Sequence, residues 1–460
     1  MKRLISILIA ALMILGVLVS CGEVPTEPAS DVSSESEQAS AEPSDTETGA
    51  PDTESETEPG YQYIPPEDGS FTVCGIDLSE YSMLLYFEAN AANGYLNRSI
   101  LVKDIERNTA SCLGYEKKLT VVKNDRFNTT PKSEHEILFG NNFHREGIPE
   151  LDLKKNCYGV TADGTIYFSA PSHMLYGYLW RLFLEEFFGY DSSAGEKSAG
   201  CALTECYREL PELDLAKLEA SGYSLVFADE FDGDSLDMDV WDWREPGPRF
   251  EPPFFDTTSL DQVVVKDGIL TMIAKYREDG EFGPGYYGVF LGLRQYYCRG
   301  YFEARIKCSY AEDRSPDYAS AFWIEGDDPY HAANSQMGIG PGGTEIDIME
   351  NFGPDYHTCC FWASGAKEGD ALTNEVYHVI GIGNNYLEEY HTYSLLWDED
   401  AYTVYLDGMV IAHSSFLAGT ATVGEQVLLS LLCCSIDETK PETRDVVREM
   451  KVDYVRIWQK

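Results

Sequence analysis

The sequence has few basic residues for its length. Among 460 residues, Lys and Arg number 34 and Asp and Glu number 78, which gives a formal net charge of −44 at neutral pH. A strongly acidic chain repels polyanions, so this charge argues against nucleic acids and sulfated polysaccharides as partners. Neutral ligands are therefore favoured, and no feature of the sequence indicates a protein partner.

Long hydrophobic runs are also scarce. The apolar run near the N-terminus, residues 4–19, follows two basic residues and is short for spanning a bilayer. With the small Ser20 after it, this pattern predicts a secretory signal peptide over residues 1–20. The sequence Leu18-Val19-Ser20-Cys21 also resembles a bacterial lipobox, which implies a lipid on the Cys21 thiol and a protein held at the extracellular face of the cell membrane. Plain secretion with an incidental cysteine is the alternative.

The twelve cysteines include no CxxC motif, and Cys359-Cys360 and Cys433-Cys434 are adjacent pairs. Neighbours in a strand point to opposite faces, so each pair offers one thiol to either side and metal ligation is disfavoured. Most of these cysteines are expected to be small buried hydrophobes. Export permits disulfides, but the spacing does not give their pairing.

Composition divides the rest of the chain into three parts. Residues 21–62 are rich in Glu, Ser, Thr and Pro and, from 22 to 60, contain no Lys or Arg, which predicts an extended disordered linker. Residues 63–213 predict a small α/β accessory domain, and residues 221–460 an all-β sandwich.

The α/β prediction rests on three segments. Residues 136–140 are typical of a buried strand, and residues 157–160 and 165–168 of a hairpin turning at Asp163-Gly164. Residues 175–188 have helical periodicity. This order loosely resembles the accessory domains that precede some glycosidase catalytic domains, and no catalytic constellation stands out in it.

The sandwich prediction rests on many short alternating segments with regular turns. Residues 301–307 and 452–458 alternate between polar and apolar residues. Residues 403–411 predict a hairpin around Asp407-Gly408, and Asp267-Gly268 and Asp279-Gly280 predict further turns.

Three carboxylates crowd one apolar segment of the predicted sandwich, GGTEIDIMENFG. Glu345 and Asp347 share one face of a strand, but Glu350 lies an odd number of residues from Glu345 and would face the other way. One extra residue around Ile348-Met349, a β-bulge, would return Glu350 to the same face. The interleaved apolar residues disfavour the alternatives, a solvated surface strand or a calcium-binding loop.

Two glutamates on one face suit a retaining glycosidase. One carboxylate must be ionised to attack the sugar, and the other must carry a proton for the leaving oxygen. Mutual repulsion separates the pKa values of two neighbouring acids and so gives them different roles at one pH.

Several segments together resemble glycoside hydrolase family 16, over about half of the chain. They are Ala228-Asp229-Glu230-Phe231-Asp232-Gly233, Gly300 to Lys307, Ala321-Phe322-Trp323, Glu345-Ile346-Asp347-Ile348-Met349-Glu350, Tyr390-His391-Thr392-Tyr393 and Val452 to Ile457. The resemblance implies a jelly-roll sandwich whose concave sheet holds a glycan, with Glu345 as nucleophile, Glu350 as acid/base and Asp347 as the residue that orients them. No cofactor is required for this chemistry.

The bulged spacing resembles that of the laminarinase, agarase and carrageenase branch. The acidic charge disfavours sulfated galactans, so we expect internal cleavage of a neutral polysaccharide, with β-1,3-glucan first. Two departures concern the sugar-binding surface: Ala319-Ser320 replaces the usual Trp-Pro, and Phe361-Trp362 replaces His-Trp. An agarase-like β-galactan hydrolase and a non-catalytic glycan-binding lipoprotein are the alternative functions.

The resemblance also suggests secondary sites. Trp323 and Trp362 would stack on sugar rings, with core packing as the alternative. Arg305 would lie in the cleft or form a surface salt bridge. A structural calcium ion, which prefers six to eight oxygen ligands, would involve Glu230, Gly268 and Asp453.

Overall fold

A computed structural model describes residues 71–86, 98–113, 120–125, 131–140, 148, 155–192, 200–249, 253–309, 317–326, 344–351, 357–363, 373–378, 386–415, 420–434 and 436–460. The predicted signal peptide, Cys21 and the whole of the predicted linker lie outside these ranges and stay predictions. No helix within the described ranges has the length and hydropathy needed to cross a membrane.

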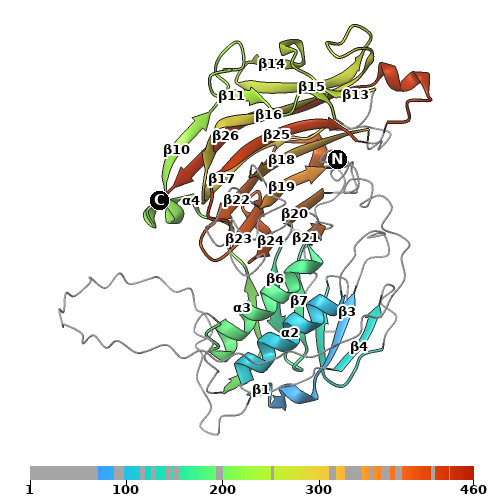
Figure 1. The fold of residues 1–460 in the computed structure, drawn as a ribbon. Helices are drawn as coiled ribbons and strands as arrows, with labels where there is room; N and C mark the ends of the chain where they lie inside the picture. Colours follow the sequence, from blue (N-terminus) through green and yellow to red (C-terminus); the bar gives the residue numbers. More distant parts are fainter. Residues whose placement is uncertain are drawn as a thin grey trace, which may run out of the picture. The chain divides into compact units, whose positions relative to one another are not determined.

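The N-terminal part of the described chain contains a mixed six-stranded sheet in the order β4-β3-β5-β7-β6-β9 and two long helices (Figure 1). Its strands are β3 Ser82–Tyr86, β4 Thr120–Asp125, β5 Glu136–Phe139, β6 Cys157–Val160, β7 Ile166–Ser169 and β9 Cys206–Glu209. Its helices are α2 Arg98–Leu113 and α3 Tyr176–Phe188. A separate small sheet contains β1 Phe71–Val73, β2 Ile76–Asp77 and β8 Cys201–Leu203. The predicted strand, hairpin and helix are confirmed.

Helix α3 covers the sheet with an aromatic face. Phe183 packs edge-on against Phe168 of β7, and the Trp180 indole donates a 3.0 Å hydrogen bond to Thr109 of α2. The helix ends at Gly189, whose φ of 64° is the left-handed conformation that glycine adopts easily at a helix C-terminus.

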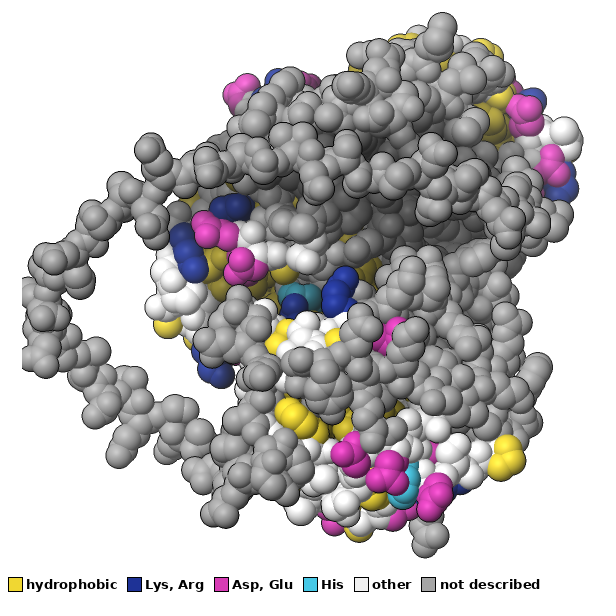
Figure 2. Space-filling view, turned by 60° about the horizontal axis from the view of Figure 1, so that its bottom comes forward, with side chains coloured by type: hydrophobic (Ala, Val, Ile, Leu, Met, Phe, Trp, Pro, Cys, Tyr) yellow, Lys and Arg dark blue, Asp and Glu magenta, His cyan; other side chains and the backbone are white. Residues whose placement is uncertain are grey.

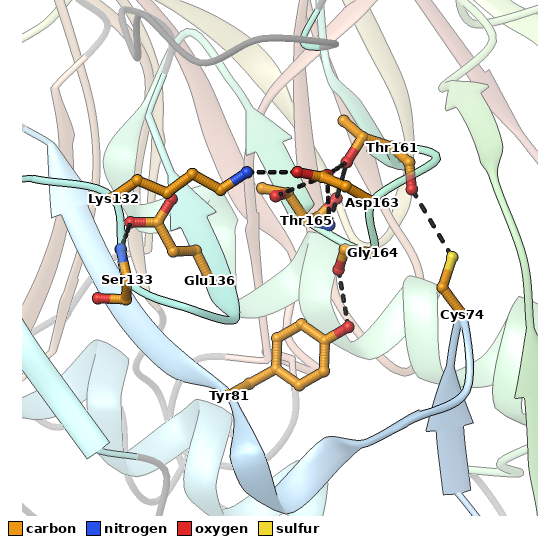
Figure 3. Close-up of polar contacts among 9 residues, drawn as sticks. All are labelled: Cys74, Tyr81, Lys132, Ser133, Glu136, Thr161, Asp163, Gly164 and Thr165. Atoms are coloured by element: carbon orange, nitrogen blue, oxygen red, sulfur yellow. Dashed lines mark hydrogen bonds and ion pairs between the residues drawn. The ribbon is translucent and has the colours of Figure 1, made fainter.

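The turn of the β6–β7 hairpin is closed by a polar network (Figure 3). The Gly164 amide donates to the Thr161 carbonyl at 2.9 Å, and the Tyr81 hydroxyl donates to the Gly164 carbonyl at 2.7 Å. Hydrogen bonds from Lys132 and Thr161 hold the pKa of Asp163 well below its usual range. This network accounts for the Asp163-Gly164 turn, and we assign it a structural role.

The C-terminal part forms the predicted all-β jelly-roll sandwich, which is confirmed. One sheet, here called the site sheet, has the order β21-β20-β19-β18-β25-β16-β11; the other, the second sheet, is built around β22, β17, β26 and β15 (Figure 1). The site-sheet strands are β11 Trp241–Trp243, β16 Gly285–Tyr297, β18 Tyr318–Glu325, β19 Glu345–Asn351, β20 His357–Ala363, β21 Thr373–His378 and β25 Glu425–Cys433. Strand β16 is long enough to pair in both sheets.

The remaining elements lie mainly in or beside the second sheet. They are α4 Leu215–Ala220, β10 Ser224–Asp229, β12 Gly247–Pro248, β13 Phe254–Asp256, β14 Val263–Lys266, β15 Ile269–Arg277, β17 Gly300–Lys307, β22 His391–Trp397, β23 Tyr402–Leu406, β24 Met409–Ser414 and β26 Val447–Gln459. In β17 the predicted apolar face, Phe302, Ala304 and Ile306, is fully buried. The predicted β23–β24 hairpin turns at Asp407 and Gly408, whose φ values of 49° and 85° are those of a type I′ turn.

Apolar side chains from the two sheets meet between them. Phe361 of β20 stacks on Tyr402 of β23 with ring centroids 5.3 Å apart. The Met349 sulfur lies 3.7 Å from the sulfur of Cys308, the residue after β17. These contacts identify the core-facing side of the site sheet, and residues of opposite parity face away from the core.

The described surface reflects the excess of acids. Figure 2 shows acidic side chains spread over the described residues of one face, with basic side chains among them. Acidic side chains therefore occur on this face in addition to those of the site described next.

Candidate active site

A β-bulge interrupts β19 at the predicted position. Phe322 and Trp323, consecutive residues of β18, pair with Met349 and Asp347, so Ile348 has no opposite residue. The pairing with β20 shifts at the same place, between Asp347 and Glu350. The extra residue lies in Ile348-Met349, and the bulge prediction is confirmed.

The bulge restores Glu350 to the face of Asp347. Glu350 pairs with Ala321 and Asp347 pairs with Trp323, and these two partners lie two residues apart in β18. Side chains two residues apart in a strand share a face. Glu345 lies two residues before Asp347, so the register places all three acids on the face opposite the core.

The apolar residues between the acids anchor the strand. Ile346, Ile348 and Met349 have no solvent exposure, whereas Glu345 and Glu350 are half-buried. Both residues of the bulge therefore point into the core, and the carboxylates stand on a well-packed support. Such packing limits the freedom of the backbone that carries the site.

The carboxylates perturb one another. Burial and the neighbouring carboxylates of Glu325 and Glu350 raise the pKa of Glu345 well above its usual value, while Arg249 opposes this rise. Burial also raises the pKa of Glu325 to about 7, against the lowering effect of Arg244. Burial and mutual repulsion therefore both favour the protonated forms of Glu345 and Glu325.

Glu325, Arg244 and Gln426 were not identified from the sequence as site residues. An Arg244 nitrogen lies 3.1 Å from a Glu325 carboxylate oxygen, and another donates to the Gln426 side-chain oxygen at 2.5 Å. The parity of β18 could have revealed Glu325, because Glu325 and Trp323 share a face. Arg244 and Gln426 come from distant segments, and their sequence context gives no comparable signal.

Gly292 makes room for this cluster. A Cβ atom at Gly292 would lie 2.5 Å from the Gln426 side-chain nitrogen and 2.9 Å from Leu428. The Gln426 nitrogen donates to the Leu293 carbonyl at 2.8 Å, which fixes the side chain in that space.

Trp323 borders the acids, as its register with Asp347 requires. Its ring stacks on Phe290 with centroids 5.4 Å apart and an interplanar angle of 16°, and its indole donates to the Ser430 hydroxyl at 3.2 Å. The side chain is half-buried, so part of the ring remains accessible. Trp362 pairs with Glu345 in the β19–β20 ladder, which places its backbone beside the site.

The structure does not bring Arg305 to the carboxylates. Arg305 belongs to β17 of the second sheet, where it pairs with Asp453 and lies over the Tyr390 ring at 4.8 Å. Of the two predicted roles, the salt bridge is observed and the cleft role is not. Sequence position indicates the strand but not which sheet the strand joins.

The three residues predicted for calcium lie close together in the second sheet: Glu230 follows β10 and Gly268 precedes β15, and both strands pair with β26 next to Asp453. A Cβ atom at Gly268 would lie 3.9 Å from the Glu230 carbonyl, so these two backbones are neighbours. The Glu230 carboxylate, however, binds Arg456 at 2.7 and 2.9 Å, and Asp453 pairs with Arg305. Within the described ranges, no three His, Cys, Asp or Glu side chains are placed to share a metal ion. A calcium ion here would therefore depend mainly on backbone oxygens, and the site stays a prediction.

The ten cysteines whose side chains are described carry no disulfide, and Cys359, Cys360 and Cys433 are buried, as expected for small hydrophobes. Cys360 pairs with Asp347 in the β19–β20 ladder. Burial and, after it, the nearby carboxylates raise the pKa of the Cys360 thiol well above its usual value, which disfavours the reactive thiolate.

This geometry suits acid/base and nucleophilic chemistry on one strand. Three carboxylates in alternation, with a half-exposed tryptophan beside them and arginines at one end, can supply a nucleophile, a proton donor and a stacking surface.

Comparison with known proteins agrees with that chemistry. Residues 254–423 match the family model of glycosyl hydrolases family 16. The chain matches no curated protein.

Solved structures resemble about half of the chain. The LamA catalytic domain from Zobellia galactanivorans is 22% identical, with 52% of this chain and 99% of that one covered and a TM-score of 0.41. The laminarinase catalytic domain from Thermotoga maritima is 23% identical, with 52% and 98% covered and a TM-score of 0.41. Porphyranase B from Zobellia galactanivorans is 16% identical, with 52% and 92% covered and a TM-score of 0.40.

The residues of the carboxylate-bearing strand fall inside the matched family segment, 254–423. Residues 254–423 are thus identified as a glycosyl hydrolases family 16 domain, which is the domain of a glycoside hydrolase.

Proposed function

We propose that this protein is a retaining endo-β-glycosidase that hydrolyses a neutral polysaccharide, with β-1,3-glucan as the first-choice substrate. The observation that supports it best is the bulge in β19, which gives Glu345, Asp347 and Glu350 one common face despite the odd spacing.

The proposed reaction is a double displacement. The Glu345 carboxylate attacks the anomeric carbon, the glycosidic C–O bond breaks, and the Glu350 carboxylic acid gives its proton to the departing oxygen. Water then loses a proton to Glu350 and adds to the same carbon, which releases Glu345. Asp347, between them on the strand, orients the pair. The first step removes the charge of Glu345, so Glu350 then loses its proton more readily and can accept one from water.

The preference for a neutral substrate follows from charge. With a formal net charge of −44, the protein repels sulfated chains, and the described part of the site face carries at least four carboxylates. Trp323 offers an aromatic ring beside Asp347, where the apolar face of an uncharged sugar can stack.

We further propose that residues 221–460 act as the catalytic domain, that residues 63–213 are accessory, and that a lipid on Cys21 and the acidic linker hold both outside the cell membrane. The basis is the lipobox-like sequence and the linker composition. Replacing Cys21 with Ser should release the protein from the membrane fraction into the medium. Retention of the Cys21→Ser protein in the membrane fraction would contradict the anchor.

The substrate is tested with laminarin, mixed-linkage glucan, agarose and carrageenan, read as reducing ends. We expect turnover of laminarin with a rapid drop in chain length. Activity on agarose alone would favour a β-galactan hydrolase, and binding without turnover a glycan-binding protein. Proton NMR of the first product should show the β-anomer; an initial α-anomer would contradict retention.

A further inference from the structure

A fourth carboxylate lies across from Glu345. Ile324 of β18 pairs with Ile346 of β19, so one residue further along the antiparallel ladder Glu325 comes opposite Glu345. Directly opposite side chains in a sheet have Cβ atoms about 4.5–5.5 Å apart, and like charges there repel. The chain therefore sets an acid beside the proposed nucleophile, where repulsion is strongest.

The position of Glu325 is fixed by its partners. Arg244 lies 3.1 Å from the carboxylate and also donates to Gln426, which stands opposite Glu325 in β25. The Arg244 backbone amide donates to the Phe290 carbonyl at 2.9 Å. The side chains of Arg244 and Glu325 are 17% and 16% exposed, so this ion pair is largely shielded from solvent. A pair this constrained differs from a mobile surface salt bridge.

Other charged groups surround the two acids. The described titratable groups around the two acids include Glu350, Asp347, Cys360, Arg249, Arg244, Glu245 and Glu425. Of the charges that perturb Glu345, Glu325 has the largest effect, ahead of Glu350, and Arg249 acts in the opposite direction. The cross-strand acid is therefore the dominant charged neighbour of the nucleophile.

We propose that Glu325, held by Arg244 across the strand pair from Glu345, is a positioning residue that controls whether the Glu345 carboxylate carries a proton and so sets the lower pH limit of turnover. The inference rests on the proposed function only in giving Glu345 the nucleophile's role.

The two acids share a proton over a range of pH. The negative charge of ionised Glu325 opposes ionisation of Glu345, so Glu345 loses its proton, and becomes able to attack, only at higher pH. Replacing Glu325 with a neutral residue removes the repulsion, so Glu345 ionises at lower pH. We expect the titration of Glu345 to move down by about 1 pH unit in Glu325→Gln.

The test follows the titration directly, without substrate. The full chain is labelled with 13C at the glutamate side-chain carboxyl carbon, and the Glu345 signal is assigned by its loss in Glu345→Gln. Wild type, Glu325→Gln, Glu325→Met and Glu325→Asp are then titrated by NMR. Glu399→Gln is the control, since the Glu399 side chain is 81% exposed and lies in a different part of the molecule, beside Arg299.

We expect the titration of Glu345 to shift to lower pH in Glu325→Gln and Glu325→Met. It should change little in Glu325→Asp, which keeps the charge, and not at all in Glu399→Gln. Glu325→Met provides the answer if Glu325→Gln does not fold. Equal titration of Glu345 in wild type and the neutral variants would overturn the inference, as would an equal shift in Glu325→Asp.

Activity gives the second measurement. On a cleaved polysaccharide, the acidic limb of kcat/KM should move to lower pH in Glu325→Gln by the same amount as the NMR titration. A shifted NMR titration in a protein that cleaves no polysaccharide would uphold the inference and contradict the proposed function. Failure of the role proposed for Glu325 and failure of the proposed hydrolase function therefore give different results.

Discussion

Trp323 stands directly opposite Asp347, although the residue before it, Phe322, stands opposite Met349. One step along β18 thus corresponds to two steps along β19. This mismatch puts an aromatic ring and an acid side by side on the site face and allows Glu350 to join them.

Replacing either outer glutamate should abolish most turnover. Glu345→Gln removes the proposed nucleophile, and Glu350→Gln removes the proton donor, a change typically worth about 10²- to 10⁴-fold in rate. Both side chains are half-buried and both substitutions keep the shape of the side chain. The thermal unfolding midpoint of each variant, measured by circular dichroism, should therefore remain close to that of wild type. Full activity in either variant, measured as reducing ends, would contradict the assignment.

Trp323→Ala should weaken substrate binding more than it slows the chemistry. Loss of the ring removes the stacking surface beside Asp347, and we expect KM to rise by about tenfold with a smaller change in kcat. Trp323→Phe keeps an aromatic ring over Phe290, so its KM should lie between the values of wild type and Trp323→Ala. An unchanged KM in the alanine variant would indicate that Trp323 serves packing alone.

Gly292→Ala should disturb the cluster that holds Glu325. The new methyl group would meet Gln426 and Leu428 closer than van der Waals contact, so we expect destabilisation of about 1–3 kcal/mol. The matched control is Gly233→Ala, whose Cβ would lie 3.4 Å from the Ser235 carbonyl and needs little adjustment. Urea unfolding of both variants gives the comparison; equal stabilities would show that the space beside Gly292 is not limiting.

Asp256 should make stability depend on pH. Burial raises its pKa to about 6, against the lowering effect of Arg249, so the folded protein holds a proton that the unfolded chain releases near pH 4. An acid whose pKa is raised on folding favours the folded state at low pH, and this contribution is lost as pH rises from about 4 to 6.

Asp256→Asn removes this titration. The difference in unfolding free energy between wild type and the variant should therefore change by up to about 3 kcal/mol between pH 4 and 6, with wild type losing more as pH rises. Denaturant unfolding at a series of pH values measures the difference. Parallel pH profiles would mean that Asp256 titrates normally.

The bulge was predictable because parity can be counted along one strand. Glu350 lies five positions after Glu345, and a shared face requires an even difference or one extra residue in the strand. The hairpin at Asp407-Gly408 and helix α3 were predictable for the same reason, since their signals are local.

The rest of the site depends on contacts between distant segments. Arg244 reaches Glu325 and Gln426, which lie 81 and 182 residues away along the chain. Alternation placed Arg305 on a polar face but could not say which sheet that face belongs to, and the structure places it in the second sheet. Spacing cannot supply such information, because it comes from the order of strands in the sheets.

The extra residue of β19 lengthens only the buried side of the strand. Ile348 and Met349 both point into the core, so between Asp347 and Glu350 the strand contributes two side chains to the core face and none to the face that carries the acids. A strand with unequal sides bends at that point. A polysaccharide bound along β19 would therefore find Glu345 and Glu350 on either side of the bend. A polysaccharide whose own shape follows the bend would contact both glutamates at once.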